Sequence, residues 1–186
     1  MLDLRPFSAD GHRVRWTRVD GADAAVESFT LEWENEAWTA SGRVGREDVQ
    51  YVIRVAPTWH VRQFMLFRDL DQPDLWLAID ARHRWGEVNG SYRRELDGCA
   101  DVELSCTPFP VTVPIRRLGL GVGEAADLPV VSIDVETLAA EVVRVRYERH
   151  GPRSWRRTRL DDGSAREFNV DEHGLVLDEP GRFQRA

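Results

Sequence analysis

Apolar and polar residues alternate along most of the chain, a pattern typical of strands that bury one face. Residues 29–33 and 143–147 are the clearest cases, because every second side chain is aromatic or aliphatic and the others are threonine, glutamate or arginine. We predict about eleven or twelve such strands joined by tight turns, and no helix longer than a turn or two. This spacing favours a mainly β fold, either a curved antiparallel sheet or a half-open β-barrel.

Two segments carry additional information. Residues 59–70 are apolar at both parities, so this strand is expected to be covered on both sides and to lie in the middle of the core. Asn89 and Gly90 form a strong signal for a two-residue hairpin turn, since both central positions of such a turn need positive φ. The sequence therefore predicts a hairpin made of residues 83–88 and 91–96.

The stretch 98–118 interrupts the series of strands. It begins with alternation at Val102 and Leu104, but Pro108, Pro110 and Pro114 then follow at close spacing. Because proline lacks an N–H and restricts the residue before it, neither a central strand nor a helix interior runs easily through them. We expect this segment to cross the molecule without joining the sheet. Residues 114–118 are expected to form a short helical turn or a rigid loop.

The 186 residues are expected to form one domain with an ordered core at about residues 11–183. The net charge is −7 and there is no lysine, which disfavours nucleic acid as a partner and excludes Schiff-base chemistry. The histidines lack metal-ligand spacing, and Cys99 and Cys106 are not placed to bridge, so we expect no metal, cofactor or disulfide. Without a signal-like or membrane-spanning apolar run, the protein is expected to be cytoplasmic, as a monomer or homodimer.

Aromatic residues beside turns are candidates for ligand contacts. Trp59 and Trp85 lie next to predicted turns and close to arginine or histidine, and an aromatic face at a rim suits a sugar ring. The arginine-rich strand around Trp155, with arginines at 153, 156, 157 and 159, is interpreted first as a solvated face and second as a basic patch for an anionic head group.

Arg116 and Arg117 could each hold a carboxylate or phosphate of a ligand. Since adjacent side chains do not point the same way, we predict that one of them forms an inward ion pair with Asp101 or Glu103. The other guanidinium is then expected to contact solvent or a ligand.

The sequence TPFPVTVPIRRL at residues 107–118 resembles the motif of a bacterial family of “putative glycolipid-binding” proteins. The matching positions are Thr107, Pro108, Thr112, Pro114, Ile115, Arg116, Arg117 and Leu118, whereas Pro110 and Val111 replace the threonine and asparagine of the family. Weaker matches include Trp59 with Arg62. The resemblance implies a fold similar to periplasmic lipoprotein carriers, in which a half-open barrel holds an acyl chain beneath a crossing segment. The candidate ligand-binding residues are then Trp59, Arg62, Trp85, Asp101, Arg116 and Arg117.

Three hypotheses for function stay open at this point. The first is a non-enzymatic binding or carrier protein for an amphiphile such as a glycolipid, held in the concave face of the sheet. The second is a hydrolase or isomerase acting on a small glycoside through Asp101 or Glu103, which needs an open polar cleft and a carboxylate of raised pKa. The third is a structural interaction module that uses an exposed sheet edge or the strand near Trp155. We favour the first, because the predicted core strand, rim aromatics and crossing segment fit an amphiphile.

Overall fold

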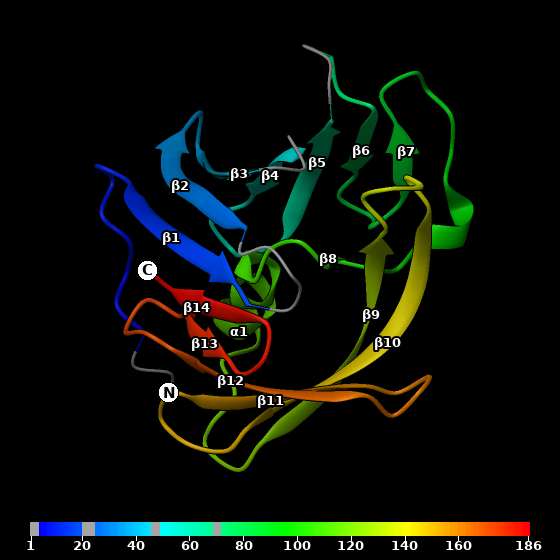
Figure 1. The fold of residues 1–186 in the computed structure, drawn as a ribbon. Coiled ribbons are helices and arrows are strands. Elements are labelled where there is room, and N and C mark those ends of the chain that lie inside the picture. Colours follow the sequence, from blue (N-terminus) through cyan, green and yellow to red (C-terminus); the bar gives the residue numbers. More distant parts are fainter. Residues whose placement is uncertain (1–3, 20–24, 46–48, 69–71) are drawn as a thin grey trace.

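A computed structural model describes residues 4–19, 25–45, 49–68 and 72–186 (Figure 1). The strands are β1 (His12–Arg18), β2 (Val26–Glu34), β3 (Ala37–Val44), β4 (Val49–Val55), β5 (Val61–Phe67), β6 (Leu75–Ile79), β7 (Trp85–Glu87), β8 (Val102–Leu104), β9 (Ala125–Ile133), β10 (Ala140–Arg149), β11 (Ser154–Arg159), β12 (Ala165–Val170), β13 (Val176–Glu179) and β14 (Phe183–Arg185). The helical elements are the 3-10 turns η1 (Arg94–Leu96) and η2 (Phe109–Val111) and the helix α1 (Thr112–Leu118).

The strands form one sheet in the order β7-β6-β5-β4-β3-β2-β1-β14-β13-β12-β11-β10-β9-β8. Strands that follow each other in the chain pair antiparallel in the two runs β1–β7 and β9–β14, and β1 joins the runs by pairing with β14. The sheet curls around a central space, but its edge strands do not pair with each other, so the barrel stays open (Figure 1). The predicted mainly β, curved antiparallel fold is confirmed, with a few more strands than expected.

The edge strand β8 runs parallel to β9, with Val102 opposite Val131 and Leu104 opposite Ile133. The chain reaches this position only after crossing from β7 to the other edge of the sheet, and no hairpin sets its direction. Pro129 lies on the part of β9 that has no β8 partner. Its missing N–H therefore removes no ladder bond on that side.

The predicted hairpin at Asn89-Gly90 is only partly correct. After the turn, residues 91–96 make a single bridge from Tyr92 to Gly86 and then form η1 instead of a strand. The carboxylate of Asp97 accepts a hydrogen bond from the Trp85 backbone N–H at 2.9 Å, so a side chain takes the place of a strand partner. Leu96 turns into the core and is fully buried.

Two further expectations about strands are wrong. In β5, Phe64 and Leu66 are buried but Met65 and Phe67 are only half-buried, because no described element packs on the outer face there. This strand is therefore covered on one side, and its expected end at residues 69–70 lies outside the described residues. Residues 183–185, at and beyond the expected end of the ordered core, form β14 and join the two halves of the sheet.

Residues 107–118, here called the strap, run through the space inside the curl (Figure 1). They form η2 and α1, and Gly119 ends the helix with a φ of 60° in the left-handed region. Pro114 is the third residue of α1, where a backbone N–H has no partner within the helix. The prediction that this segment crosses the molecule is confirmed.

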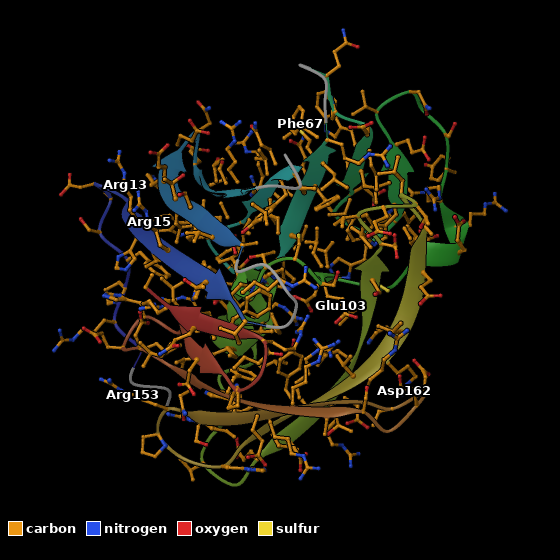
Figure 2. All side chains as sticks on the ribbon, in the orientation of Figure 1. Arg13, Arg15, Phe67, Glu103, Arg153 and Asp162 are labelled. Atoms are coloured by element: carbon orange, nitrogen blue, oxygen red, sulfur yellow. The ribbon has the colours of Figure 1, made fainter. Side chains whose placement is uncertain are left out.

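Packed side chains fill the curl. One apolar cluster joins the inner faces of β1–β6 to Phe109 and Val113 of the strap, and a second joins the inner faces of β9–β13 to Ile115. Side chains occupy the space between the two halves of the sheet, and Glu103 points into it (Figure 2). The cavity beside the strap near Thr107 has a volume of only about 20 Å³. The curl therefore holds a solid core where the sequence pattern suggested a hollow.

A buried polar group anchors the strap to the sheet. The carboxylate of Glu27 on β2 accepts hydrogen bonds from the Tyr51 hydroxyl at 2.5 Å and from Thr107 at 2.8 Å. Burial raises the pKa of Glu27 to about 7, although both hydrogen bonds oppose this shift. Gly42 on β3 makes room for the Tyr51 ring, since an added Cβ would lie 2.2 Å from a ring carbon. Glycine is thus required where the aromatic ring crosses β3.

Candidate functional site

Six aromatic and imidazole side chains meet at one end of the curl. This aromatic cluster consists of Phe7, His12, Trp33, Trp38, Trp59 and His173. Phe7 is at its centre: its ring centroid lies 5.1 Å from His173, 5.6 Å from Trp59 and 5.7 Å from Trp38. Trp38 and Trp59 stack with their planes 20° apart. Contacts of this kind are typical of surfaces that bind rings or apolar chains.

Trp59 is held in an uncommon backbone conformation. Its φ is 60°, in the left-handed region that is costly for a bulky side chain by roughly 1–2 kcal/mol. The tight turn around it is closed by hydrogen bonds between Ala56 and its neighbours, from Trp59 N–H to Ala56 O and from Ala56 N–H to His60 O, both 2.8 Å. Backbone strain of this size often marks a functional position, because contacts elsewhere in the structure must offset its free-energy cost.

Arg116 of α1 lies against the aromatic cluster. Its guanidinium carbon is 4.5 Å from the Trp59 ring centroid and 4.7 Å from that of Phe7, so the cation packs against both rings, which also contact each other at 5.6 Å. The Nη1 group donates to two backbone carbonyls, His173 O at 2.6 Å and Arg5 O at 3.1 Å. Burial lowers the pKa of Arg116 to about 10, with Asp171 acting in the opposite direction.

Arg116 has no carboxylate within ion-pair distance among the described residues. Its Nε is buried and without a hydrogen-bond partner in this part of the chain. A buried cation is normally paired with an anion, since neutral carbonyls compensate only part of its lost hydration. The Nε–H of Arg116 is therefore a hydrogen-bond donor with no acceptor among the described residues.

The N-terminal segment 4–7 covers this guanidinium. The Arg5 backbone donates to Glu172 O at 2.7 Å, and His173 Nδ1 lies 3.3 Å from the Arg5 carbonyl oxygen. Phe7 is only 7% exposed. The ordered core therefore begins earlier than the predicted residue 11, because Phe7 packs as a core residue.

Arg117, the other arginine of the motif, forms an ion pair with Asp101. Asp101 is 1% exposed, and its burial raises the pKa to about 6 while the Arg117 guanidinium acts in the opposite direction. Glu103 pairs instead with Arg157, a buried residue of β11. The prediction of one inward ion pair from the two adjacent arginines is confirmed. Arg157 also shows that the arginine-rich strand is not wholly a solvated face.

A polar groove of about 680 Å³ lies on the other side of the Trp59 turn. Among its lining residues are Arg54, His60, Arg62, Gln63, Asp80 and His83. The rings of His60 and His83 are nearly parallel, 5.8 Å apart. The pKa of His60 is lowered by burial and by the positive charges of Arg117 and His83. The groove thus lies close to α1, which contributes Arg116 to the aromatic cluster and Arg117 to the charge near His60.

The predicted site residues are divided among three places. Trp59 and Arg116 meet in the aromatic cluster, Arg62 lines the groove, and Asp101 and Arg117 form the buried pair between these regions. The expected rim position of Trp85 is wrong. Its side chain has no exposed surface, and its indole N–H donates to the Cys99 carbonyl at 3.0 Å in the core.

Sequence reasoning missed several residues at this end of the curl. Phe7 precedes the ordered core that was expected from residue 11, and the histidines were considered only as metal ligands. Their meeting depends on the pairing of β1 with β14, which no local pattern indicates. The alternation at residues 29–33 did place Trp33 on a strand, β2, whose inner face lies in the core.

The described residues contain no cluster of three or more histidine, cysteine, aspartate or glutamate side chains suited to a metal ion. No helix within the described ranges has the length and apolar character needed to span a membrane.

Comparison with known proteins gives two findings. A family profile described as “Putative glycolipid-binding” matches residues 13–185. The crystal structure of a DUF1089 family protein from Pseudomonas aeruginosa is similar, with a TM-score of 0.75 and 29% sequence identity over 90% of this chain and 95% of that chain. A search of curated proteins found no match.

Proposed function

Because this chain belongs to the family described as “Putative glycolipid-binding”, we propose that it binds an amphiphile, with glycolipids as the ligand class. The apolar part of the ligand enters the curl at the aromatic cluster, and the polar part stays at its outer end near Arg116. The role is binding or transport without catalysis.

The observation that carries this proposal is the environment of Arg116. Its guanidinium packs against the rings of Phe7 and Trp59, and it bonds only to backbone carbonyls within the described residues. A polar head group can replace a carbonyl as acceptor, while an aromatic face covers a sugar ring or the first carbons of a chain. The site thus offers a donor for a polar head group and an aromatic face for the apolar part of an amphiphile, side by side.

Entry of the ligand requires the N-terminal segment to move. Side chains of the described residues pack within the curl, and the Phe7 ring occupies the position between Trp38, Trp59 and His173 that a ligand would take. Apart from side-chain packing, the segment is held by one backbone hydrogen bond to Glu172, an exposed ion pair of Arg5 with Glu172 at 3.8 Å, and the contacts at the Arg5 carbonyl. We expect the segment to behave as a displaceable plug.

A catalytic role is less well supported. An acid/base pair needs carboxylates that face a common cleft. Asp101 and Glu103 are each taken by a different arginine, Arg117 and Arg157. Cys99 and Cys106 are both buried and are not joined in a disulfide, which fits the reducing conditions of a cytoplasm.

Binding of octyl glucoside, kept below its micelle concentration, tests the proposal by calorimetry. Phe7→Ala should tighten binding by about ten- to a hundredfold, because burial of a phenyl ring is worth roughly 1.5–3 kcal/mol and the variant no longer closes the site. Ser8→Ala is the matched control, since that exposed hydroxyl bonds with Asp10. Trp59→Leu should weaken binding. Unchanged affinity in both Phe7→Ala and Trp59→Leu would contradict the proposal.

A further inference from the structure

The polar groove beside the Trp59 turn has an unusual balance of charge for a protein with a net charge of −7. Two guanidiniums and two imidazoles line it, against one carboxylate, Asp80. That carboxylate is already paired with Arg84 at 2.6 Å. The groove therefore presents more positive than negative groups.

Neither arginine of the groove has a carboxylate partner in the described part of the chain. Arg54 makes one long contact, 3.5 Å from Nη2 to the Glu34 carbonyl, and its Nε is buried without a partner. Arg62 is exposed and has no hydrogen-bond or ion-pair partner among the described residues. By contrast, most arginines of the second half of the sheet, β9–β14, form ion pairs, as Arg146 does with Asp127 at 2.6 Å. Unpaired guanidiniums that converge on one groove suit an anionic ligand.

The backbone also holds the groove in a defined shape. His83 has a φ of 55°, in the left-handed region, and its carbonyl accepts a hydrogen bond from Gly98 N–H at 3.0 Å. His60 is fixed on the other side by the Trp59 turn, and its Nδ1 lies 3.1 Å from the Thr58 hydroxyl. The two imidazoles are therefore held face to face at 5.8 Å. The Gln63 side chain adds an amide that can bond hydroxyl groups.

We propose that this groove binds the anionic, hydroxyl-bearing part of a ligand, a phosphorylated or acidic sugar, through Arg54 and Arg62. The volume of about 680 Å³ is in the range of small-molecule sites. The inference rests on the proposed function to the extent that the anion belongs to the head group of the same amphiphile. The same chemistry also fits a free sugar phosphate.

Two probes distinguish these sources. The soluble probe is glucose 6-phosphate, with glucose as its uncharged control. The lipid probe is a phosphatidylcholine vesicle containing about one fifth phosphatidylglycerol, with pure phosphatidylcholine as control. Binding is followed by calorimetry and flotation on the full chain. The His60 ring protons are followed by NMR, because a bound anion should raise the lowered pKa of His60.

Arg54→Gln and Arg62→Gln are each expected to weaken binding by about tenfold or more, since a charge-assisted contact is lost in each. Arg13→Gln is the matched control, because Arg13 is exposed on the outer side of β1, away from the groove (Figure 2). Binding of the soluble probe alone identifies a free ligand, and binding of the vesicle identifies a lipid head group. Both outcomes support the groove if they depend on Arg54 and Arg62.

The inference is overturned if neither charged probe binds better than its uncharged control. It is equally overturned if Arg13→Gln weakens binding as much as the groove variants. Octyl glucoside binding measured on the same samples separates the two proposals, because it depends on Phe7 and Trp59. If that binding persists while the charged probes fail, the groove inference is wrong and the proposed function stands.

Discussion

Replacing Glu27 by glutamine tests how the strap is attached to the sheet. Glu27 is 2% exposed, and one of its carboxylate oxygens accepts both hydrogen bonds, from Tyr51 and Thr107. The other oxygen, Oε2, is buried and has no partner among the described residues. Burial therefore outweighs hydrogen bonding and raises the pKa from 4.5 to about 7.

The pH dependence of stability follows from this shift. Below about pH 4.5 the carboxyl is protonated in both the folded and the unfolded chain. As the pH rises to about 7, the unfolded chain releases this proton first, so the free energy of unfolding falls. At about 1.4 kcal/mol per pH unit, the loss is at most about 3 kcal/mol, and it is complete above pH 7. Glu27→Gln removes the titrating group and with it this loss.

Urea unfolding of the wild type and of Glu27→Gln between pH 4.5 and 8 measures the effect. The difference between their free energies of unfolding should move by up to about 3 kcal/mol in favour of glutamine as the pH rises. Glu32→Gln, which removes an exposed carboxylate of the same strand, is the control. The reasoning about the buried anchor is refuted if wild type and Glu27→Gln lose stability in parallel over this range.

Three other predictions concern the core. Arg117→Ala should destabilise the fold by about 3–5 kcal/mol in chemical denaturation, because it leaves the buried Asp101 carboxylate unpaired. The double variant with Asp101→Asn should regain stability, and no regain would contradict this pairing. Gly42→Ala should lower the melting temperature, with a cost of about 1–3 kcal/mol, since the new methyl group meets the Tyr51 ring; a neutral effect would mean that the ring is not packed there. Burial raises the pKa of the Cys99 thiol to about 11, so a thiol reagent at pH 8 should modify it only after unfolding, and rapid modification of the folded protein would show that the site is open.

Most of the strands could be predicted from the sequence, because the sheet has one core face and alternation follows directly from that arrangement. β10 and β2 are examples, and their observed bounds lie close to the predicted patterns. The returning strand at residues 91–96 was wrong because the backbone bonds to β7 only at Ser91 and Arg93; the chain then turns into η1, and the Asp97 side chain accepts the remaining bond from the Trp85 N–H. The strand β14 was missed because only three residues pair, and its partner β1 is at the opposite end of the chain.

The candidate site could be predicted only in part. The strap and its two arginines stand out in the sequence, since closely spaced prolines exclude a strand and adjacent guanidiniums need separate partners. The role of Phe7 depends on a contact between the start of the chain and α1, which has no local signature. Trp85 lies beside a turn in the sequence, but the turn folds back over it and buries the indole.

The central claim is that an amphiphile enters the curl by taking the place of the Phe7 ring. NMR of the full chain with octyl glucoside measures this directly, through nuclear Overhauser contacts from the ligand to aromatic side chains. The account predicts contacts from the ligand to Trp59 and Trp38, together with loss of the contact between Phe7 and Trp59. Ligand contacts confined to the half-buried Phe67 on the outer face of β5, with Phe7 still packed against Trp59, would contradict it.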